Sequence, residues 1–231
     1  MTETLGTENV SIVLHPESDK DMEAIEKNDV KDKILEAAFG LFCRNGIKSV
    51  SMDDIAQHLG VSKKTIYKWF ANKDEMVYAA TQRYLLGMEE NCECIISRTD
   101  NAIHELLKIM EMNKDIFSKI HPSIFYDLQK YHPETWQLWQ NHKNNFILQK
   151  IMENMNKGIA EGLFRKDFDI EVLSRLRLAQ IDIAFNPQIF PPEKFDVKKV
   201  QLDCLEHFML GIATLKGHKL INKYKHITEE E

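Results

Sequence analysis

Glycine and proline are scarce in this chain, which has nine glycines and six prolines among 231 residues. Sandwiches and barrels join many short strands through turn residues, and no strand-like alternation persists anywhere in the sequence. Lysine, glutamate, leucine, isoleucine and methionine are plentiful, and all of these except isoleucine are good helix formers. The composition therefore predicts an all-α fold.

Long apolar runs and regularly spaced cysteines are also missing. No run approaches the roughly 18 apolar residues of a membrane span, and the first residues lack the basic-then-apolar order of a secretory leader. The four cysteines, Cys43, Cys92, Cys94 and Cys204, do not form a disulfide framework. We therefore expect a cytoplasmic protein without membrane contact. Cys92 and Cys94 form a lone C-x-C, which indicates either two half-buried thiols or a metal or redox pair.

Motifs of catalysis are absent as well. The sequence has no Gly-rich phosphate loop, no nucleophile elbow, no H-E-x-x-H and no EF-hand loop. Its nine histidines are scattered, and the spacing of His121 and His132 is not typical of metal ligands. We predict that the protein is not an enzyme and that it needs no metal and no cofactor.

Charge is distributed unevenly around the net value of −6. Residues 1–30 carry eight carboxylates and two lysines, whereas residues 31–73 carry eight lysine or arginine side chains and four carboxylates. Salt screens exposed charges beyond roughly 8 Å at physiological ionic strength, so the local excess decides which partners can bind. Residues 31–73 are the basic block of an otherwise acidic chain.

Residues 1–28 lack a steady apolar period and predict a flexible acidic extension, with helix near residues 20–27. Two roles stay open for this extension: shielding a basic face from nonspecific DNA, or keeping the chain in solution. From Asp29 onward apolar residues recur at helical spacing, and Asn45-Gly46 ends that helix.

Three further helices follow with recognisable caps. Ser51 is a good N-cap for a helix that ends at Gly60, Ser62 caps the next, and Asn72 caps a fourth that we expect to reach about Ser97. Ala56 is small where two helices must approach closely, and Gly60 can take positive φ in the turn. This pattern is typical of a helix-turn-helix unit, whose second helix enters the DNA major groove.

The second helix of that unit, around VSKKTIYKWF at residues 61–70, has two faces. At helical spacing Ile66, Trp69 and Phe70 share an apolar face. The opposite face is basic and comprises Lys63, Lys64, Tyr67 and Lys68. Alone, this pattern is compatible with any amphipathic helix that has a solvated basic side. The preceding helix-turn-helix pattern favours a DNA-contacting surface.

Residues 31–77 resemble the DNA-binding region of the TetR (tetracycline-repressor-like) family of transcriptional regulators. The matching segments are ILEAAFGLFCRNG, SMDDIAQHLGVS, TIYKWF and NKDEM. The resemblance implies a homodimer, a C-terminal domain for ligand binding and dimerisation, and release of a double-stranded DNA operator when a small-molecule effector binds. By the same resemblance, repression is the usual mode of action.

The resemblance also implies roles for single residues. Ser51, Tyr67 and Lys73 match positions that contact phosphates, Lys73 together with backbone N–H groups at the start of its helix. A second group matches positions that contact bases or the backbone: Ser62, Lys63, Lys64, Thr65 and Lys68. Lysine can donate to guanine and threonine can touch a thymine methyl group. For Thr65, helix capping is an equal alternative.

Beyond residue 100 we expect longer helices near 101–119, 121–131, 134–160, 169–185 and 196–218. Aromatic residues and an isolated acid in this region predict an apolar effector pocket, with plain helical core as the alternative for each member. The candidate residues are Phe117, Phe125, Tyr126, Trp136, Trp139, Phe146 and Asp182. For Asp182, a ligand amine and an internal hydrogen bond are both open.

We therefore predict three regions: an acidic extension at 1–28, a helix-turn-helix DNA-binding domain at 29–75, and a larger helical domain for effector binding and dimerisation at 76–231. The last two long helices would build the bundle between subunits, although their periodicity alone does not separate a dimer seam from a core. The predicted function is a DNA-binding regulator. The alternative is a helical ligand-binding or adaptor protein without specific DNA binding.

Overall fold

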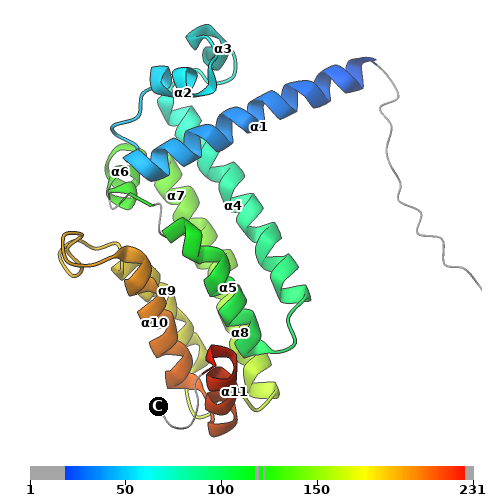
Figure 1. Ribbon diagram of the computed structural model, residues 1–231, viewed down its shortest axis with the longest axis vertical. Helices are drawn as coiled ribbons and strands as arrows, with labels where there is room; N and C mark the ends of the chain where they lie inside the picture. The colour runs from blue at the N-terminus through cyan, green and yellow to red at the C-terminus, as the bar shows by residue number, and fades with distance from the viewer. Residues whose placement is uncertain (1–18, 118–119, 122, 227–231) are drawn as a thin grey trace, which may run out of the picture.

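The computed structural model describes residues 19–117, 120–121 and 123–226. These residues form helices and no β-strand, as predicted, in two regions that share the long helix α4 (Figure 1). None of the helices in these ranges is both long and apolar enough to cross a membrane. The elements are α1 Asp19–Asn45, α2 Met52–Leu59, α3 Lys63–Tyr67, α4 Lys73–Ser97, α5 Ala102–Phe117, α6 Ile124–Tyr131, α7 Pro133–His142, the π-helix η1 Lys143–Ile147, α8 Leu148–Ala160, α9 Ile170–Ile183, α10 Val197–Ile212 and α11 Leu215–Lys225.

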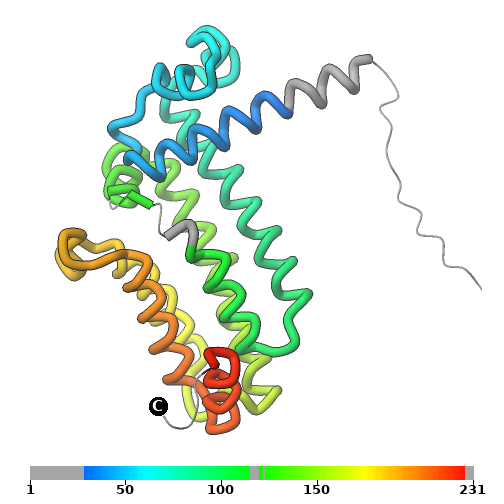
Figure 2. Tube along the Cα trace, in the orientation of Figure 1, coloured from blue at the N-terminus to red at the C-terminus, as the bar shows by residue number. Residues whose placement is uncertain are grey.

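Helix α1 begins at Asp19, earlier than the predicted start at Asp29, so the helix predicted near residues 20–27 is its first part. The rest of the predicted extension, residues 1–18, lies outside the described residues. Gly46 ends α1 with φ of 79°, a conformation that glycine adopts without strain. Helices α1 and α4 cross (Figure 2), and the rings of Phe39 and Tyr84 stack between them with centroids 4.1 Å apart.

The predicted caps of the short helices are confirmed. The side chains of Ser51, Ser62 and Asn72 each accept a hydrogen bond from the backbone N–H three residues later. Gly60 ends α2 with φ of 66°. Helix α3 spans five residues, and Ile66 together with the following Phe70 is buried in the core.

The first core joins the helix-turn-helix to the rest of the molecule. Ile55 of α2 and Ile66 of α3 are fully buried against α1, and Met76 and Val77 of α4 belong to the same cluster. Ile124 and Leu128 of α6 complete it. The boundary predicted after residue 75 therefore falls inside a continuous helix and a continuous apolar cluster.

A second core lies at the other end of the molecule, among α5, α8, α10 and α11. Here the predicted helix 196–218 is wrong. Helix α10 ends at Ile212, because Ala213 is extended and pairs with Phe164 in an isolated bridge. Thr214 then caps α11, and its backbone N–H donates to Leu163 O at 2.9 Å.

The predicted helix 134–160 exists, but its hydrogen bonding changes midway. Residues Lys143–Ile147 form a π-helical turn between α7 and α8. Insertions of this kind often occur at functional positions in helices. Lys143 begins the turn, and its side chain is buried. The turn thus directs a lysine into the interior.

Candidate nucleic-acid interface and effector cavity

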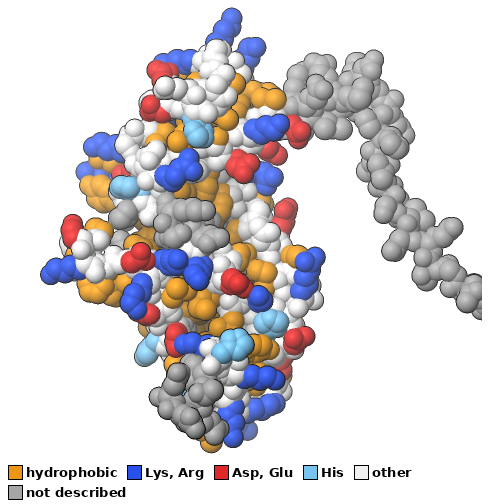
Figure 3. Space-filling model, viewed as in Figure 1, with side chains coloured by type: hydrophobic (Ala, Val, Ile, Leu, Met, Phe, Trp, Pro, Cys, Tyr) orange, Lys and Arg blue, Asp and Glu red, His pale blue; other side chains and the backbone are white. Residues whose placement is uncertain are grey.

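Helix α3 stands at one end of the molecule with its basic side outward. Lys63, Lys64 and Lys68 are exposed, and Tyr67 is 43% exposed. Ile66 and Phe70, on the opposite side, are 0% and 1% exposed. Figure 3 shows lysine and arginine side chains gathered at the tip formed by α2 and α3. The geometry presents a row of cations that a protruding helix can insert into a DNA groove.

The three lysines of this face are not equivalent. Lys63 Nζ lies 2.8 Å from Asp53 Oδ1 of α2 and 5.8 Å from the centroid of the Tyr67 ring. The hydrogen bond that Lys63 donates to Asp53 raises the pKa of Lys63. Among the described residues, Lys64 and Lys68 have no ion-pair partner. Two lysines are therefore available to a DNA phosphate or base, and the third is held by a carboxylate.

The hydroxyl side chains among the predicted contacts serve as caps. Ser51 and Asp54 form a capping box: Ser51 Oγ donates to Asp54 Oδ2 at 2.6 Å and accepts from Asp54 N at 3.2 Å. Ser62 Oγ accepts from Thr65 N at 3.1 Å and lies 2.9 Å from Thr65 Oγ1. These hydroxyls order the ends of α2 and α3 on the same exposed surface as the lysines.

Lys73 begins α4 and lies beside a second lysine that the sequence analysis did not single out. Lys73 Nζ donates to the backbone oxygen of Lys48 at 3.4 Å. Burial lowers the pKa of Lys73, whereas the carboxylate of Asp127 acts in the opposite direction. Lys48 is exposed and lies over the Tyr131 ring at 5.5 Å. Its membership of the basic block was the only signal in the sequence.

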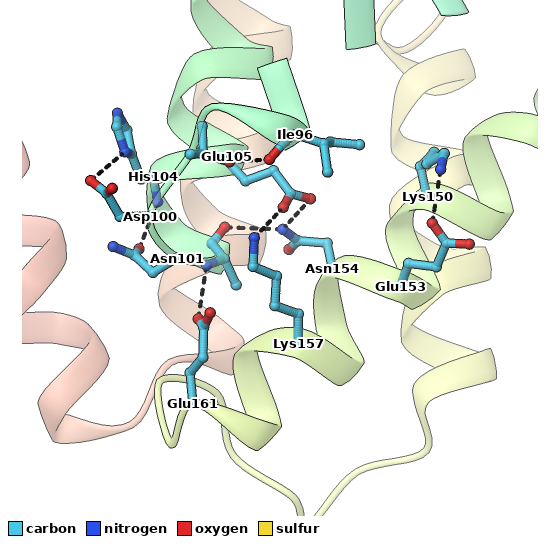
Figure 4. A network of polar contacts seen from close by, with 12 residues as sticks. Ile96, Asp100, Asn101, His104, Glu105, Lys150, Glu153, Asn154, Lys157 and Glu161 are labelled. Carbon is cyan, nitrogen blue, oxygen red and sulfur yellow. Dashed lines mark hydrogen bonds and ion pairs between the residues drawn. The ribbon is translucent and has the colours of Figure 1, made fainter. Parts of the chain in front are cut away.

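An apolar cavity of about 220 Å³ lies between the two cores. Its walls come from α1 and from the helices α4 to α10, and most of the lining side chains are aliphatic or aromatic. Preformed apolar cavities with a few polar groups are typical of small-molecule sites. The lining polar groups include Asn154, whose amide is already bonded to Ala102 O at 3.0 Å and Glu105 Oε1 at 2.8 Å (Figure 4).

The structure divides the predicted pocket residues. Phe125, Trp139 and Phe146 line the cavity. Tyr126 does not, because it points outward, is 56% exposed and packs on Tyr131. Trp136 also lies outside the lining, because it packs against the first core and meets Phe125 edge-on. The side chain of Phe117 lies outside the described residues.

Asp182 was also predicted to belong to the pocket, and it is not part of the lining. Its carboxylate forms an ion pair with the ammonium group of Lys143, the buried lysine of the π-helical turn. The acid therefore meets an amine of the protein itself. Lys143 lies in another helix, 39 positions earlier, so no local pattern around Asp182 indicates this partner.

The C-x-C pair does not converge on one site. Cys92 is buried in the cavity wall, whereas Cys94 is exposed. Burial raises the pKa of Cys92 to about 11 and that of Cys43, another lining residue, to about 12, so both thiols stay neutral. Within the described residues, no group of three or more His, Cys, Asp or Glu side chains is placed to hold a metal ion.

Two further lining residues, Arg177 of α9 and Gln201 of α10, were missed in the sequence. Arg177 is buried, with 9% of its surface exposed, and Gln201 is 2% exposed. A signal for Arg177 existed: it stands four residues after Leu173 and four before Ile181, on the apolar face of its helix. An arginine at such a position must find a partner inside the protein.

The fold and the exposed basic face define a helix-turn-helix DNA-binding protein. Residues 34–80 match the family described as bacterial regulatory proteins, tetR family. The transcriptional repressor KstR2 of Mycobacterium tuberculosis is 24% identical over 162 residues, which cover 67% of this chain and 79% of the relative. The DNA-binding region of the chain thus matches the TetR family, and KstR2, which aligns with two thirds of the chain, is a transcriptional repressor.

Solved structures share the fold along most of the chain. A transcriptional regulator of Saccharomonospora viridis, in complex with choline, has a TM-score of 0.65 at 20% identity and covers 81% of this chain and 99% of its own. FadR of Bacillus subtilis, in complex with stearoyl-CoA, has a TM-score of 0.60 at 20% identity and covers 78% of this chain and 98% of its own. At such identities the likeness concerns the fold alone.

Proposed function

We propose that the protein is a transcriptional repressor that acts in the cytoplasm, binds a palindromic double-stranded DNA operator as a homodimer, and leaves it when a small, largely apolar effector enters the cavity. In this proposal α1 to α3 and the start of α4 form the DNA-binding domain. The remaining helices form the domain for effector binding and dimerisation. Repressors among the relatives support the mode of action.

The exposed face of α3 is the observation that carries the proposal. Lys64 and Lys68 have no ion pair among the described residues, while the other side of the helix is anchored by Ile66 and Phe70. A helix held in this way can enter a major groove while its buried side remains packed in the core. We assign the DNA contacts to Ser51, Ser62, Lys63, Lys64, Thr65, Tyr67, Lys68 and Lys73.

The route from effector to DNA is short. Ile124 and Leu128 of α6 line the cavity and also belong to the first core, which holds α2 and α3. The Asp127 carboxylate, between them in sequence, accepts a hydrogen bond from the backbone N–H of Lys48 at 3.1 Å. An effector that displaces α6 therefore moves the base of the DNA-binding domain, and the spacing of the two α3 helices in a dimer changes.

An exposed apolar stripe on α9 supports the homodimer. Val172, Leu176 and Ile183 are 60%, 52% and 39% exposed, and their spacing places them along one side of the helix. Apolar stripes of this kind are typical of subunit interfaces, where a second copy covers the same surface.

A gel-shift titration with the DNA upstream of the protein's own gene tests the proposal. We expect a discrete complex whose affinity falls with salt by about 0.9 log unit, per log unit of salt, for each phosphate neutralised. The double variant Lys64→Ala/Lys68→Ala loses the complex. The matched control Lys219→Ala/Lys223→Ala removes two exposed lysines of α11, at the far end of the molecule, and leaves binding unchanged.

Two outcomes would contradict the proposal. A folded dimer that binds no DNA, or binds without salt dependence, would favour the alternative of a ligand-binding or adaptor protein. Equal losses in Lys64→Ala/Lys68→Ala and in Lys219→Ala/Lys223→Ala would show that binding depends only on net charge.

A further inference from the structure

The cavity carries an unbalanced positive charge. Among the described residues that line it, no side chain is acidic and two are cationic, Lys150 and Arg177. Lys150 is neutralised within the protein, because its Nζ lies 2.7 Å from Glu93 Oε1 and 2.9 Å from Glu153 Oε2. Figure 4 shows Lys150 directed at Glu153. Arg177 has no such carboxylate partner in the part of the chain that the structure describes.

Among the described residues, Arg177 has no carboxylate within ion-pair distance. The contact of its guanidinium with Gln180 Oε1 is long, at 3.4 Å. Burial lowers the pKa of Arg177 to about 10, and the side chain is therefore still charged near neutral pH. A buried charge without a partner makes the folded state markedly less stable than a buried charge that is paired. The fold thus maintains a cation in an apolar chamber at the expense of its own stability.

Two neutral polar atoms in the same lining also lack partners. Gln201 Oε1 is buried with no hydrogen bond in the structure, although the amide nitrogen of that side chain donates to Ile181 O at 2.8 Å. Trp139 Nε1 is likewise buried without an acceptor. Buried polar atoms of folded proteins are nearly always bonded, so exceptions that line one cavity indicate a missing ligand.

The position of Arg177 determines how a ligand can lie. Arg177 and Ile181 are one helical turn apart on α9, and Gln201 of α10 is bonded to the backbone of that turn. The cation therefore belongs to the α9–α10 wall of the cavity. Phe125 and Trp139 belong to α6 and α7, and the Phe125 ring packs against Phe185 in a tilted arrangement with ring centroids 4.2 Å apart. The lining combines one charged wall with aromatic walls.

We propose that the effector is an amphipathic monocarboxylate whose anionic end pairs with Arg177 and whose apolar body fills the rest of the cavity. This inference rests on the proposed function and specifies its effector class. A guanidinium and a carboxylate form a planar, bidentate pair. A nucleotide-linked ester carries several phosphates and calls for several unpaired cations, whereas the lining offers one.

Calorimetric titration of the full chain with decanoate, 1-decanol, decylamine and decanoyl-CoA tests the inference. The first three share one alkyl chain and differ in the charge of the head group. We expect decanoate to bind and to raise the melting temperature, 1-decanol to bind more weakly, and decylamine to be rejected by the like charge of Arg177. In Arg177→Met the preference for decanoate over 1-decanol is lost, with an affinity for decanoate about tenfold to a hundredfold lower.

The matched control is Arg175→Met on the same helix. Arg175 is exposed and paired with Glu171 at 2.8 Å, so its removal leaves the preference for decanoate intact. Unliganded Arg177→Met is expected to melt no lower than the wild type, because it loses a buried unpaired charge. If Arg177→Met fails to fold, Arg177→Lys retains the charge without the planar fork and binds decanoate with intermediate affinity.

Several results would overturn the inference. Decanoate and 1-decanol binding equally, or a preference for decanoate that survives in Arg177→Met, would remove Arg177 from effector recognition. Binding of decanoyl-CoA alone would assign a nucleotide ester in place of a free acid. If decanoate does not bind but the wild type still shifts operator DNA, the proposed effector class is wrong and the proposed DNA-binding function is kept. If decanoate binds but no DNA complex forms, the proposed DNA-binding function is wrong and the ligand class is kept.

Discussion

Lys63 Nζ lies 2.8 Å from Asp53 Oδ1, so the first lysine of α3 is held by a carboxylate of the preceding helix. Both side chains are more than half exposed, and such surface pairs contribute roughly 0–1 kcal/mol. The pair is therefore weak enough for a DNA phosphate to replace the carboxylate. The two adjacent lysines therefore differ before DNA binds: Lys63 must exchange a carboxylate for a phosphate, whereas Lys64 has no ion pair with a described residue.

Replacing Asp53 by asparagine is expected to strengthen nonspecific DNA binding. The change removes a negative charge that faces the phosphates and releases Lys63, and the salt dependence steepens by about 0.9 if one more phosphate is neutralised. Fluorescence anisotropy on a random duplex across a salt series measures both effects. Asp203→Asn makes the same charge change in a pair with Lys199 on α10; an equal gain there would attribute the effect to net charge.

Lys64 and Lys63 are expected to differ in what they contribute to sequence preference. Lys64 has no ion pair with any described residue, and Lys64→Ala should cost about 1–3 kcal/mol of operator binding and relax preference at one base pair. Lys63→Ala should weaken all sequences by a smaller, uniform amount. Binding to a set of single-base operator variants separates the two; uniform weakening by Lys64→Ala would reduce its role to a phosphate contact.

Ser51→Ala is expected to lower the free energy of unfolding by about 0.5–2 kcal/mol near neutral pH, because α2 loses its N-cap. Urea denaturation followed by circular dichroism provides the measurement. Ser97→Ala, at the exposed C-terminal end of α4, is the control and should change stability by less than about 0.5 kcal/mol. A null effect of Ser51→Ala would mean that Asp54 holds the turn without it.

The capping box also predicts a pH dependence. The hydrogen bonds from the hydroxyl and the backbone N–H of Ser51 lower the pKa of Asp54 below its ordinary value of 3.8. The folded state thus favours the ionised carboxyl, and this contribution is fully present above the unfolded pKa and lost as pH falls through the folded one. The stability difference between wild type and Ser51→Ala should be constant from about pH 7 to 5 and shrink below about pH 4. A difference that stays undiminished below about pH 4 would contradict this assignment.

Gly158→Ala is expected to destabilise the second core. A Cβ at Gly158 would lie 2.0 Å from Cδ2 of the buried Phe164 ring, and overpacking of this kind costs typically about 1–3 kcal/mol. Gly211→Ala is the matched control, because nothing lies within 4 Å of a Cβ there. In α10 that change should be neutral or stabilise by up to about 1 kcal/mol. Thermal unfolding gives the melting temperature of each variant. Equal melting temperatures for Gly158→Ala and Gly211→Ala would contradict the prediction.

Leu176→Glu is expected to convert the proposed dimer into monomers, since it places a charge in the apolar stripe of α9. Sedimentation velocity measures the mass, and binding to a full palindrome should weaken in parallel. Leu86→Glu is the control: Leu86 is 51% exposed, nearly as much as the 52% of Leu176, but it lies on α4. If Leu176→Glu and Leu86→Glu sediment with the same mass, the subunit interface does not lie on the apolar stripe of α9.

The sequence by itself determined the features that depend on neighbours within a few residues. Ser51, Ser62 and Asn72 cap the helices that follow them because a hydroxyl or amide oxygen needs only the N–H three positions ahead. The two faces of α3 follow from helical spacing in the same way. These local rules were enough for the all-α class and the helix-turn-helix.

Only the tertiary structure decided which distant groups meet. Asp182 pairs with Lys143 and not with a ligand, and α10 ends at Ile212 because the backbone of a distant loop pairs with Ala213. Among the described residues, Arg177 meets no carboxylate inside a cavity enclosed by many helices. Burial and ion pairing depend on which helices pack together, and that arrangement is absent from any short window of the chain.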